Sequence, residues 1–126
     1  MAFWLFKEEP SHFNFTDLER SGEAAWDGVK NALALIHLRA VRPGDRVLLY
    51  QTGKEKAVVG EMKATAAKDG VVTVKPVRRL HRSVTLAEIK TQPICQTWEL
   101  VRNSRLSVMP VPEAIWTWIT STAQTA

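Results

Sequence analysis

The chain has 126 residues, 45% of them hydrophobic and 24% charged, which is enough for one domain that buries its own core without disulfides or metals. Lys plus Arg number 17 against 13 Asp plus Glu, so the net charge of +4 allows a polyanionic partner without requiring one. The single cysteine, Cys95, excludes an internal disulfide and a multi-cysteine metal site, and with it we expect a reducing, cytoplasmic location. No apolar run is long enough to span a bilayer, so we expect no membrane partner.

The N-terminal segment predicts a buried strand and then a short helix. Residues 3–6 are apolar and aromatic and are followed by charges and Pro10, which is typical of a strand that ends there. Thr16 and Glu19 have the spacing of a capping box. We therefore expect a helix from this box to the break at residues 21–22.

A second helix is predicted where apolar residues recur over 33–41. Its apolar face is broad and includes Leu33 and Ile36, and it stops at the Arg-Pro-Gly-Asp turn of residues 42–45. The pattern then becomes that of β-structure, which predicts an antiparallel meander of three strands at 47–50, 57–62 and 71–77.

The remaining segments complete an α+β pattern. Asp69 and Gly70 are typical of a hairpin turn, and Thr85 with Glu88 forms a second predicted capping box. A late strand is expected over 106–110 and a terminal helix over 112–119. Short strands with peripheral helices indicate a curved sheet or small barrel, in one domain over residues 1–120 with a frayed tail at 121–126.

Residues 26–31 (WDGVKN) hold the densest chemistry of the chain. The Trp26 indole is a flat face, Asp27 is a hydrogen-bond acceptor, and Asn31 can both donate and accept, which together suit a planar polar heterocycle. Gly28 allows a sharp turn, and Asn31 can also cap the helix that follows. The alternative is an ordinary N-cap turn with one core tryptophan, because indoles are more often buried than bound to ligands.

Three separated blocks resemble signature segments of the EVE domain family, a PUA-like group. They are residues 3–10 (FWLFKEEP), 26–31 (WDGVKN) and 100–111 (LVRNSRLSVMPV), and weaker similarity extends over 43–50 and 84–90. Three blocks in the right order are far more specific than any one of them. The chain departs from the family pattern at Ala32 and in its compact turn over 51–56, two differences that bear on pocket size.

The resemblance implies a PUA-like pseudo-barrel of mostly antiparallel strands with short peripheral helices, and a pocket for a modified base. That base would be a modified cytosine in DNA or a modified nucleotide in RNA. Trp26 would stack on it, Asp27 would accept from its exocyclic amine, and Asn31 would bind a base edge or hold the loop. Trp4 and Tyr50 have equal alternatives as a core indole and a structural hydroxyl. The expected ligand-binding set is Trp26, Asp27, Gly28, Val29, Asn31, Trp4, Tyr50, Lys7 and Ser107.

Basic residues are the candidates for contacts with a nucleic-acid backbone. One cluster surrounds His81, a second lies in the third signature block, and Lys30 lies beside the proposed pocket. A solvated surface is the alternative for each cluster, but phosphates would need cations of this kind. The predicted backbone set is Lys30, Arg78, Arg79, Arg82, Arg102 and Arg105.

The favoured interpretation is a monomeric, non-enzymatic reader of a modified base, with no cofactor and no metal. We expect Trp26→Ala to abolish base selectivity while sparing the fold. One alternative is an amidohydrolase similar to the ASCH group of PUA-like domains, which acts on acylated cytidines through lysine, threonine and glutamate and would use Lys7 with Glu9. Another is a protein-interaction adaptor that uses the basic surface and needs no pocket.

Overall fold

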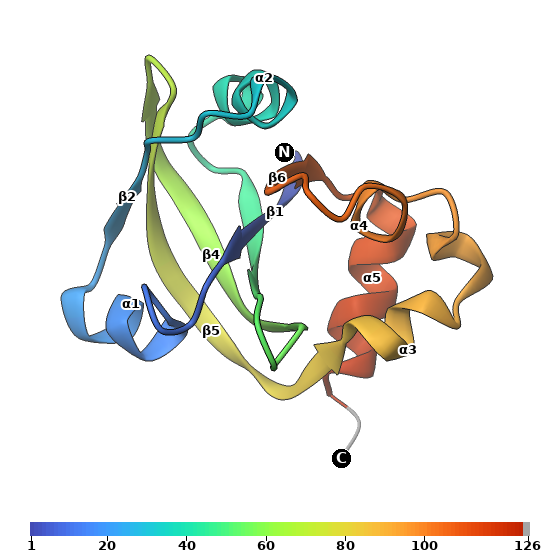
Figure 1. The fold of residues 1–126 in the computed structure, drawn as a ribbon. Helices are drawn as coiled ribbons and strands as arrows, with labels where there is room; N and C mark the ends of the chain where they lie inside the picture. The colour runs from blue at the N-terminus through green and yellow to red at the C-terminus, as the bar shows by residue number, and fades with distance from the viewer. Residues whose placement is uncertain (125–126) are drawn as a thin grey trace.

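One curled, mixed sheet of six strands, shaped as half of a barrel, organises residues 1–124, the part of the chain that the computed structural model describes (Figure 1). Five short helices surround this sheet within those residues. The predicted α+β fold of PUA-like type is confirmed. From one edge to the other, the strands are β2 (Ala24–Trp26), β5 (Val71–Thr85), β4 (Ala57–Lys68), β3 (Arg46–Gln51), β1 (Phe3–Glu8) and β6 (Val108–Pro110).

The predicted meander forms the middle of the sheet, with β3, β4 and β5 paired antiparallel in order. The turn between β4 and β5 has positive φ at both Asp69 (54°) and Gly70 (78°), the backbone that a tight hairpin requires. β4 and β5 extend well beyond the predicted ranges of 57–62 and 71–77. Their pairing shifts register at three places, and such bulges let long strands bend into a curled sheet.

β1 is the inner strand that positions the candidate sites. It pairs parallel with β3 from Phe3–Arg46 to Glu8–Gln51, and antiparallel with β6 on its other side. The parallel pair brings the carboxyl ends of β1 and β3 together, so Lys7 lies opposite Tyr50 in the register. The two residues just before this point in each strand, Leu5 and Phe6 in β1 and Leu48 and Leu49 in β3, are fully buried in the core.

The helices lie at the ends and flanks of the sheet: α1 before β2, α2 after it, and α3 to α5 together on the side of β6 (Figure 1). A short 3-10 helix at Pro93–Cys95 and the helix α4 had no counterpart in the sequence prediction. The helix bounds are α1 (Phe15–Ser21), α2 (Ala32–Ala40), α3 (Leu86–Lys90), α4 (Glu99–Arg102) and α5 (Glu113–Thr122).

The capping predictions had mixed outcomes. Thr85 and Glu88 form the predicted box at the start of α3. At α1 the predicted box of Thr16 and Glu19 was wrong, because the helix begins two residues earlier and Asn14 caps it with Asp17 as its reciprocal partner.

The predicted apolar face of α2 was also wrong in extent. Only Ala34 and Leu38 of this helix are fully buried, whereas Leu33 is 43% and Ile36 62% exposed. The helix lies across one end of the sheet beside β6 and covers it with a narrow stripe, so the other apolar side chains remain outside.

The chain stays packed beyond residue 120, where a frayed tail was predicted. α5 continues to Thr122, Ala123 is buried, and its carbonyl accepts a hydrogen bond from the Arg82 amide (3.1 Å). Residues 125–126 of the predicted tail lie outside the described residues. Over residues 1–124, none of the helices is both long and apolar enough to cross a membrane.

Candidate functional site

Trp26 forms a wall of a cavity of about 240 Å³ at the end of β2. The indole is 8% exposed; it packs against Phe6 at a centroid distance of 5.3 Å and edge-on against Phe13 at 6.2 Å. Trp26 is therefore a core residue that also forms a pocket wall, and its role in ligand binding stays a prediction. The other lining residues are Glu8, His12, Phe13, Ala24, Ala25 and Asp27.

Two carboxylates supply the polar part of this Trp26 cavity. The Glu8 carboxylate lies 3.2 Å from Nδ1 of His12 and accepts a hydrogen bond from the Glu9 amide (2.9 Å). Asp27 is exposed at the rim. None of the lining residues is a lysine or arginine. An aromatic wall beside hydrogen-bond acceptors suits a planar ligand that carries an amino group.

The rest of the 26–31 segment supports the cavity without lining it. Gly28 adopts φ = 67° and turns the chain away from β2. Asn31 caps α2, since its side-chain oxygen accepts from the Ala34 amide (2.9 Å). Val29 packs against the core, and Lys30 is exposed.

Sequence reasoning missed Glu8, His12 and Phe13 as cavity residues. Glu8 belongs to the first signature block, and its neighbour Lys7 was selected instead. Adjacent residues of a strand point to opposite faces of the sheet, so the choice of Lys7 already implied that Glu8 faces elsewhere. No sequence signal identified His12 or Phe13, which reach the cavity through the turn between β1 and α1.

Lys7 and Tyr50 line a second cavity, of about 280 Å³, on the other side of β1. The Lys7 ammonium donates to the Ser104 carbonyl (3.0 Å) and lies 5.6 Å from the centre of the Tyr50 ring. Burial lowers the pKa of Lys7 and raises the pKa of Tyr50, because it disfavours the charged form of each group. Four of the predicted ligand-binding residues thus line these cavities, Trp26 and Asp27 in the first and Lys7 and Tyr50 in the second.

Trp4 and Ser107 line neither cavity, so their predicted role in ligand binding stays a prediction. Trp4 is buried, and its indole nitrogen donates to a carboxylate oxygen of Asp45 (2.9 Å). The Ser107 carbonyl accepts from the Lys7 amide (2.9 Å) and so helps to hold β1 in place.

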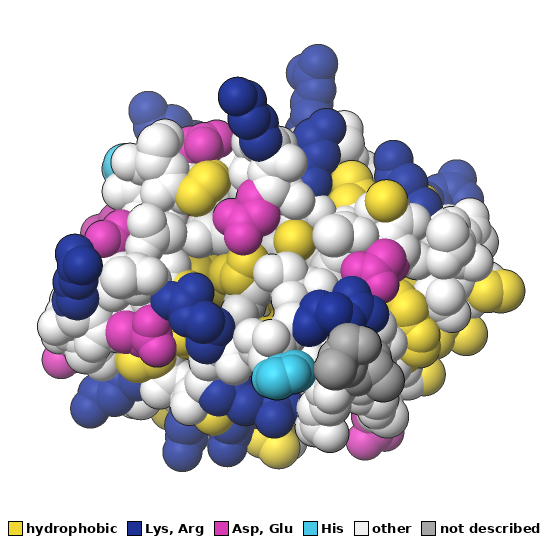
Figure 2. All heavy atoms as spheres, turned by 90° about the horizontal axis from the view of Figure 1, so that it is seen from below, with side chains coloured by type: hydrophobic (Ala, Val, Ile, Leu, Met, Phe, Trp, Pro, Cys, Tyr) yellow, Lys and Arg dark blue, Asp and Glu magenta, His cyan; other side chains and the backbone are white. Residues whose placement is uncertain are grey.

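The predicted arginine cluster on β5 is largely neutralised within the protein. Arg78 pairs with Glu61 (3.2 Å), Arg79 with Glu19 (2.7 Å), and Arg82 with Glu88 (2.9 Å). Charges of both signs are also mixed on the face shown in Figure 2, where acidic side chains lie between the Lys and Arg side chains. These pairs weaken the case for the β5 arginines as phosphate contacts.

The other three residues of the predicted backbone set differ from the β5 arginines. Arg102, Arg105 and Lys30 are exposed, and none of them forms an ion pair with the described part of the chain. These three cations remain available for an external anion.

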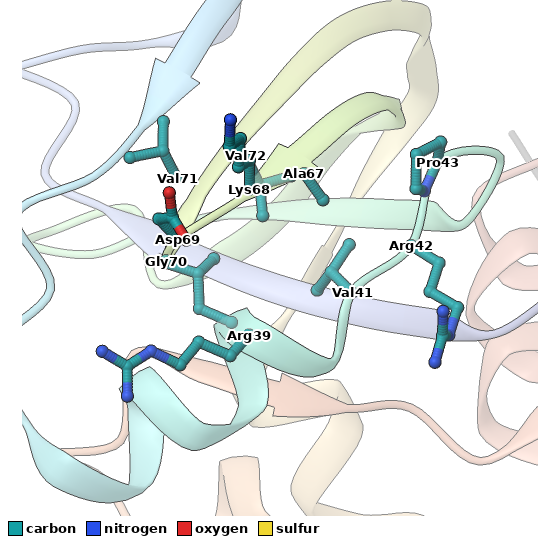
Figure 3. Close-up of a pocket in the computed structure, with 11 residues that line it drawn as sticks. Arg39, Val41, Arg42, Pro43, Ala67, Lys68, Asp69, Gly70, Val71 and Val72 are labelled. Atoms are coloured by element: carbon teal, nitrogen blue, oxygen red, sulfur yellow. The ribbon is translucent and has the colours of Figure 1, made fainter.

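A third cavity, of about 470 Å³, lies between α2 and the β4–β5 hairpin (Figure 3). No predicted site residue lines it. Its two arginines, Arg39 and Arg42, point away from one another on either side of Val41 (Figure 3). These two side chains therefore do not converge on one ligand, as the polar groups of a specific site do. Among residues 1–124, no group of three His, Cys, Asp or Glu side chains is placed to hold a metal ion.

A family model of the EVE domain matches residues 2–122. The chain belongs to the EVE domain family. This confirms the resemblance of the three sequence blocks. Mouse thymocyte nuclear protein 1 is 27% identical to this EVE domain over 98% of the chain and 74% of the mouse protein.

Solved structures share the fold. A protein from Rhodopseudomonas palustris, determined by NMR, is 32% identical with a TM-score of 0.91 and covers 98% of this EVE domain and 93% of its own chain. Human THYN1, solved in complex with DNA that contains 5-methylcytosine, is 23% identical with a TM-score of 0.92 over 100% of this chain and 99% of its own. At that identity the human structure shows a common fold.

Proposed function

We propose that this EVE domain binds a modified cytosine that is turned out of a nucleic-acid strand into the Trp26 cavity. A base must leave its stack before a protein can enclose it, and it is then held by stacking and edge contacts. The cavity of about 240 Å³ is smaller than the roughly 300–1,000 Å³ of drug-sized sites, which suits a single base. The complex of human THYN1 with 5-methylcytosine DNA supports methylated cytosine as the base.

The combination of an indole wall with two carboxylates carries this proposal. Cytosine presents an exocyclic amine, N4, as a hydrogen-bond donor, and Glu8 and Asp27 are acceptors beside the wall. A methyl group at C5 would meet the apolar lining of Phe13, Ala24 and Ala25. Lys30 is exposed three residues after Asp27 in the sequence, and we assign it to a neighbouring phosphate.

The structure changes the choice of test variant. Trp26 is almost fully buried, so Trp26→Ala is expected to cost about 3–5 kcal/mol of stability rather than spare the fold. Asp27 is exposed and has no such structural role. Asp27→Asn therefore separates recognition from folding, and Trp26→Phe retains an aromatic wall of smaller area.

The test is fluorescence anisotropy with oligonucleotides that differ at one cytosine, which is unmodified, methylated or hydroxymethylated, as DNA and as RNA. Asp27→Asn is expected to weaken binding of the methylated DNA about tenfold, the equivalent of one charge-assisted hydrogen bond. Glu23→Gln, an exposed change of equal charge outside the cavity, is the matched control. Equal affinity of wild type and Asp27→Asn for every oligonucleotide would refute the assignment of this cavity.

An amidohydrolase is the second candidate, and the environment of Lys7 is the observation that favours it. Lys7 and Thr52 line one cavity, and the Thr52 hydroxyl donates to Glu9 (3.3 Å), which brings together the lysine, threonine and glutamate of the ASCH comparison. Burial lowers the pKa of Lys7, as a reactive lysine requires. Release of acetate from N4-acetylcytidine by wild type, lost in Lys7→Met, would establish this activity.

A further inference from the structure

The cavity beside Lys7 has an unusual charge composition for a protein of nearly balanced charge. Three lysines, Lys7, Lys56 and Lys90, line it together with the hydroxyls of Tyr50 and Thr52, and no lining residue is acidic. We call it the lysine cavity. An adjoining hollow of about 370 Å³ shares Lys56 and Lys90 with it and adds one further lysine and one glutamate.

The lysines of this cavity lack internal counter-charges. Lys56 and Lys90 are exposed, and neither forms an ion pair within residues 1–124. One acid, Glu9, contacts a lining residue, because it accepts from the Thr52 hydroxyl. The β5 arginines, in contrast, each have a carboxylate partner.

Lys7 is held in a position to use its remaining hydrogens. Its ammonium gives one hydrogen bond to the Ser104 carbonyl, which leaves two N–H groups for another acceptor. The side chain is half-buried beside the Tyr50 ring, where a charge is poorly solvated. A bound anion would supply the interaction that water cannot.

Lys56 is held in a costly backbone conformation. Its φ of 41° is in the left-handed region, which side chains other than glycine and asparagine rarely adopt. The Lys56 carbonyl accepts from the Leu86 amide (2.8 Å), so the residue ties the 52–56 turn to the start of α3. Strain of this kind is concentrated at functional sites, and here it places a cation at the cavity mouth.

We infer that the lysine cavity is a binding site for a phosphate oxyanion, held by Lys7, Lys56 and Lys90. The phosphate belongs either to the backbone of a bound nucleic acid or to a small phosphate compound. The first source rests on the proposed function: Glu8 faces the Trp26 cavity and Lys7 the lysine cavity, so one strand end serves both.

The first experiment uses inorganic phosphate and no nucleic acid. Phosphate is titrated into ¹⁵N-labelled protein, with chloride at matched ionic strength as the reference. Saturable shifts are expected at the amides of Thr52, Lys56, Leu86 and Ser104. Shifts that chloride reproduces, or that centre on another part of the protein, would overturn the inference.

Matched variants separate a site from general positive charge. Lys56→Gln with Lys90→Gln is compared with Lys63→Gln and Lys75→Gln, two exposed lysines that are paired across β4 and β5. Each pair removes two positive charges. The first pair is expected to weaken phosphate binding about tenfold and the second less than about twofold. Equal effects of the two pairs would contradict a localised site.

Lys56→Gly tests whether a loss of phosphate binding comes from the missing lysine or from misfolding. Glycine relieves the left-handed strain at residue 56, so this variant is expected to melt at an equal or higher temperature than wild type. Its phosphate affinity should nevertheless fall. Retained affinity in Lys56→Gly would exclude this lysine from the site.

Oligonucleotide binding at several salt concentrations distinguishes the two phosphate sources. If a strand phosphate occupies the cavity, the Lys56 and Lys90 pair of substitutions lowers the salt dependence by about 0.9 per lost contact and leaves methyl selectivity intact. An unchanged salt dependence with weakened inorganic phosphate binding assigns a small phosphate compound. Asp27→Asn should instead lower methyl selectivity and leave the salt dependence and the binding of inorganic phosphate unchanged. The inference and the proposed function can therefore fail separately.

Discussion

Asp45 shows how one buried side chain can join two distant segments of the chain. Its carboxylate accepts from the amides of Ala2 (3.0 Å) and Arg42 (2.9 Å) and from the indole of Trp4 (2.9 Å). Burial by itself would raise the pKa of Asp45, but these hydrogen bonds and the amino terminus outweigh it and hold the pKa below its ordinary value of 3.8. The start of β1, its tryptophan and the turn before β3 thereby depend on one charge.

Asp45→Asn is therefore expected to lower the free energy of unfolding by about 2 kcal/mol at neutral pH. The asparagine amide keeps one acceptor oxygen, but its NH₂ group is a donor that would face the N–H groups that the carboxylate now accepts from. The native pKa lies below the unfolded one, so the contribution of Asp45 is present above pH 3.8 and is lost as the pH falls through the native pKa. Urea unfolding should show the wild type and variant converging in acid. The exposed substitution Asp69→Asn is the control, and a difference independent of pH would contradict this account.

The two tryptophans of the signature blocks show what residue type cannot predict. Trp4 and Trp26 both lie in apolar strands and both are nearly buried. Trp4 meets the Asp45 carboxylate and a closed core, while Trp26 meets a cavity bounded by Glu8 and Asp27. Their partners are set by the fold over long sequence separations, so the local pattern could not distinguish one tryptophan from the other.

At the scale of elements, the contact of α1 with β4 depends on the absence of one side chain. A Cβ atom on Gly60 would lie 2.2 Å from Cε1 of Phe15, the first residue of α1. Gly60→Ala is expected to cost about 1–3 kcal/mol, since the aromatic ring and its helix must move. Because Phe13 precedes this helix and lines the Trp26 cavity, selectivity for the methylated base should fall as well.

Thermal unfolding and the anisotropy assay measure these two effects. Phe15→Leu removes much of the ring and is the matched partner: in the double variant the cost of Gly60→Ala should shrink, which a double-mutant cycle detects. Strict additivity of the two substitutions would mean that the Phe15 ring is not the obstacle.

Element prediction succeeded where local chemistry decides and failed where distant contacts do. The Asp69-Gly70 hairpin and the Thr85–Glu88 cap were predictable because their determinants lie within four residues. Thr16 and Glu19 have capping-box spacing too, yet their side chains bind Arg79, which is about sixty residues away in the sequence. Tertiary contacts of this kind override local signals.

For the whole molecule, the family resemblance predicted the fold but not how the fold distributes the site residues. Lys7 and Glu8 are adjacent in β1, and strand alternation sends them to opposite faces. What each then meets comes from far along the chain: Ser104 and Lys90 on one side, and Trp26 on the other. The parallel pairing of β1 with β3 brings the ends of both strands to one place, and the two faces of β1 there line two different cavities.

The C-terminal end of α5 closes the molecule against β5. The Arg82 amide donates to the Ala123 carbonyl, Ala123 is 2% exposed, and Ile119 is fully buried one turn earlier. A chain that ends at residue 120 loses this hydrogen bond and the last turn of α5. Compared with a chain that ends at Gln124, it is expected to be less stable by about 1–3 kcal/mol.

This comparison isolates residues 121–124 and is measured by thermal and urea unfolding of the two shortened chains. The same strand end carries Arg82, whose guanidinium binds Glu88 in α3, and α3 ends at Lys90 of the lysine cavity. The shorter chain should therefore also bind inorganic phosphate more weakly, because α3 loses part of its support. Identical melting of the two chains would show that the contact between Arg82 and Ala123 adds no stability and that the domain ends at residue 120, as the sequence alone suggested.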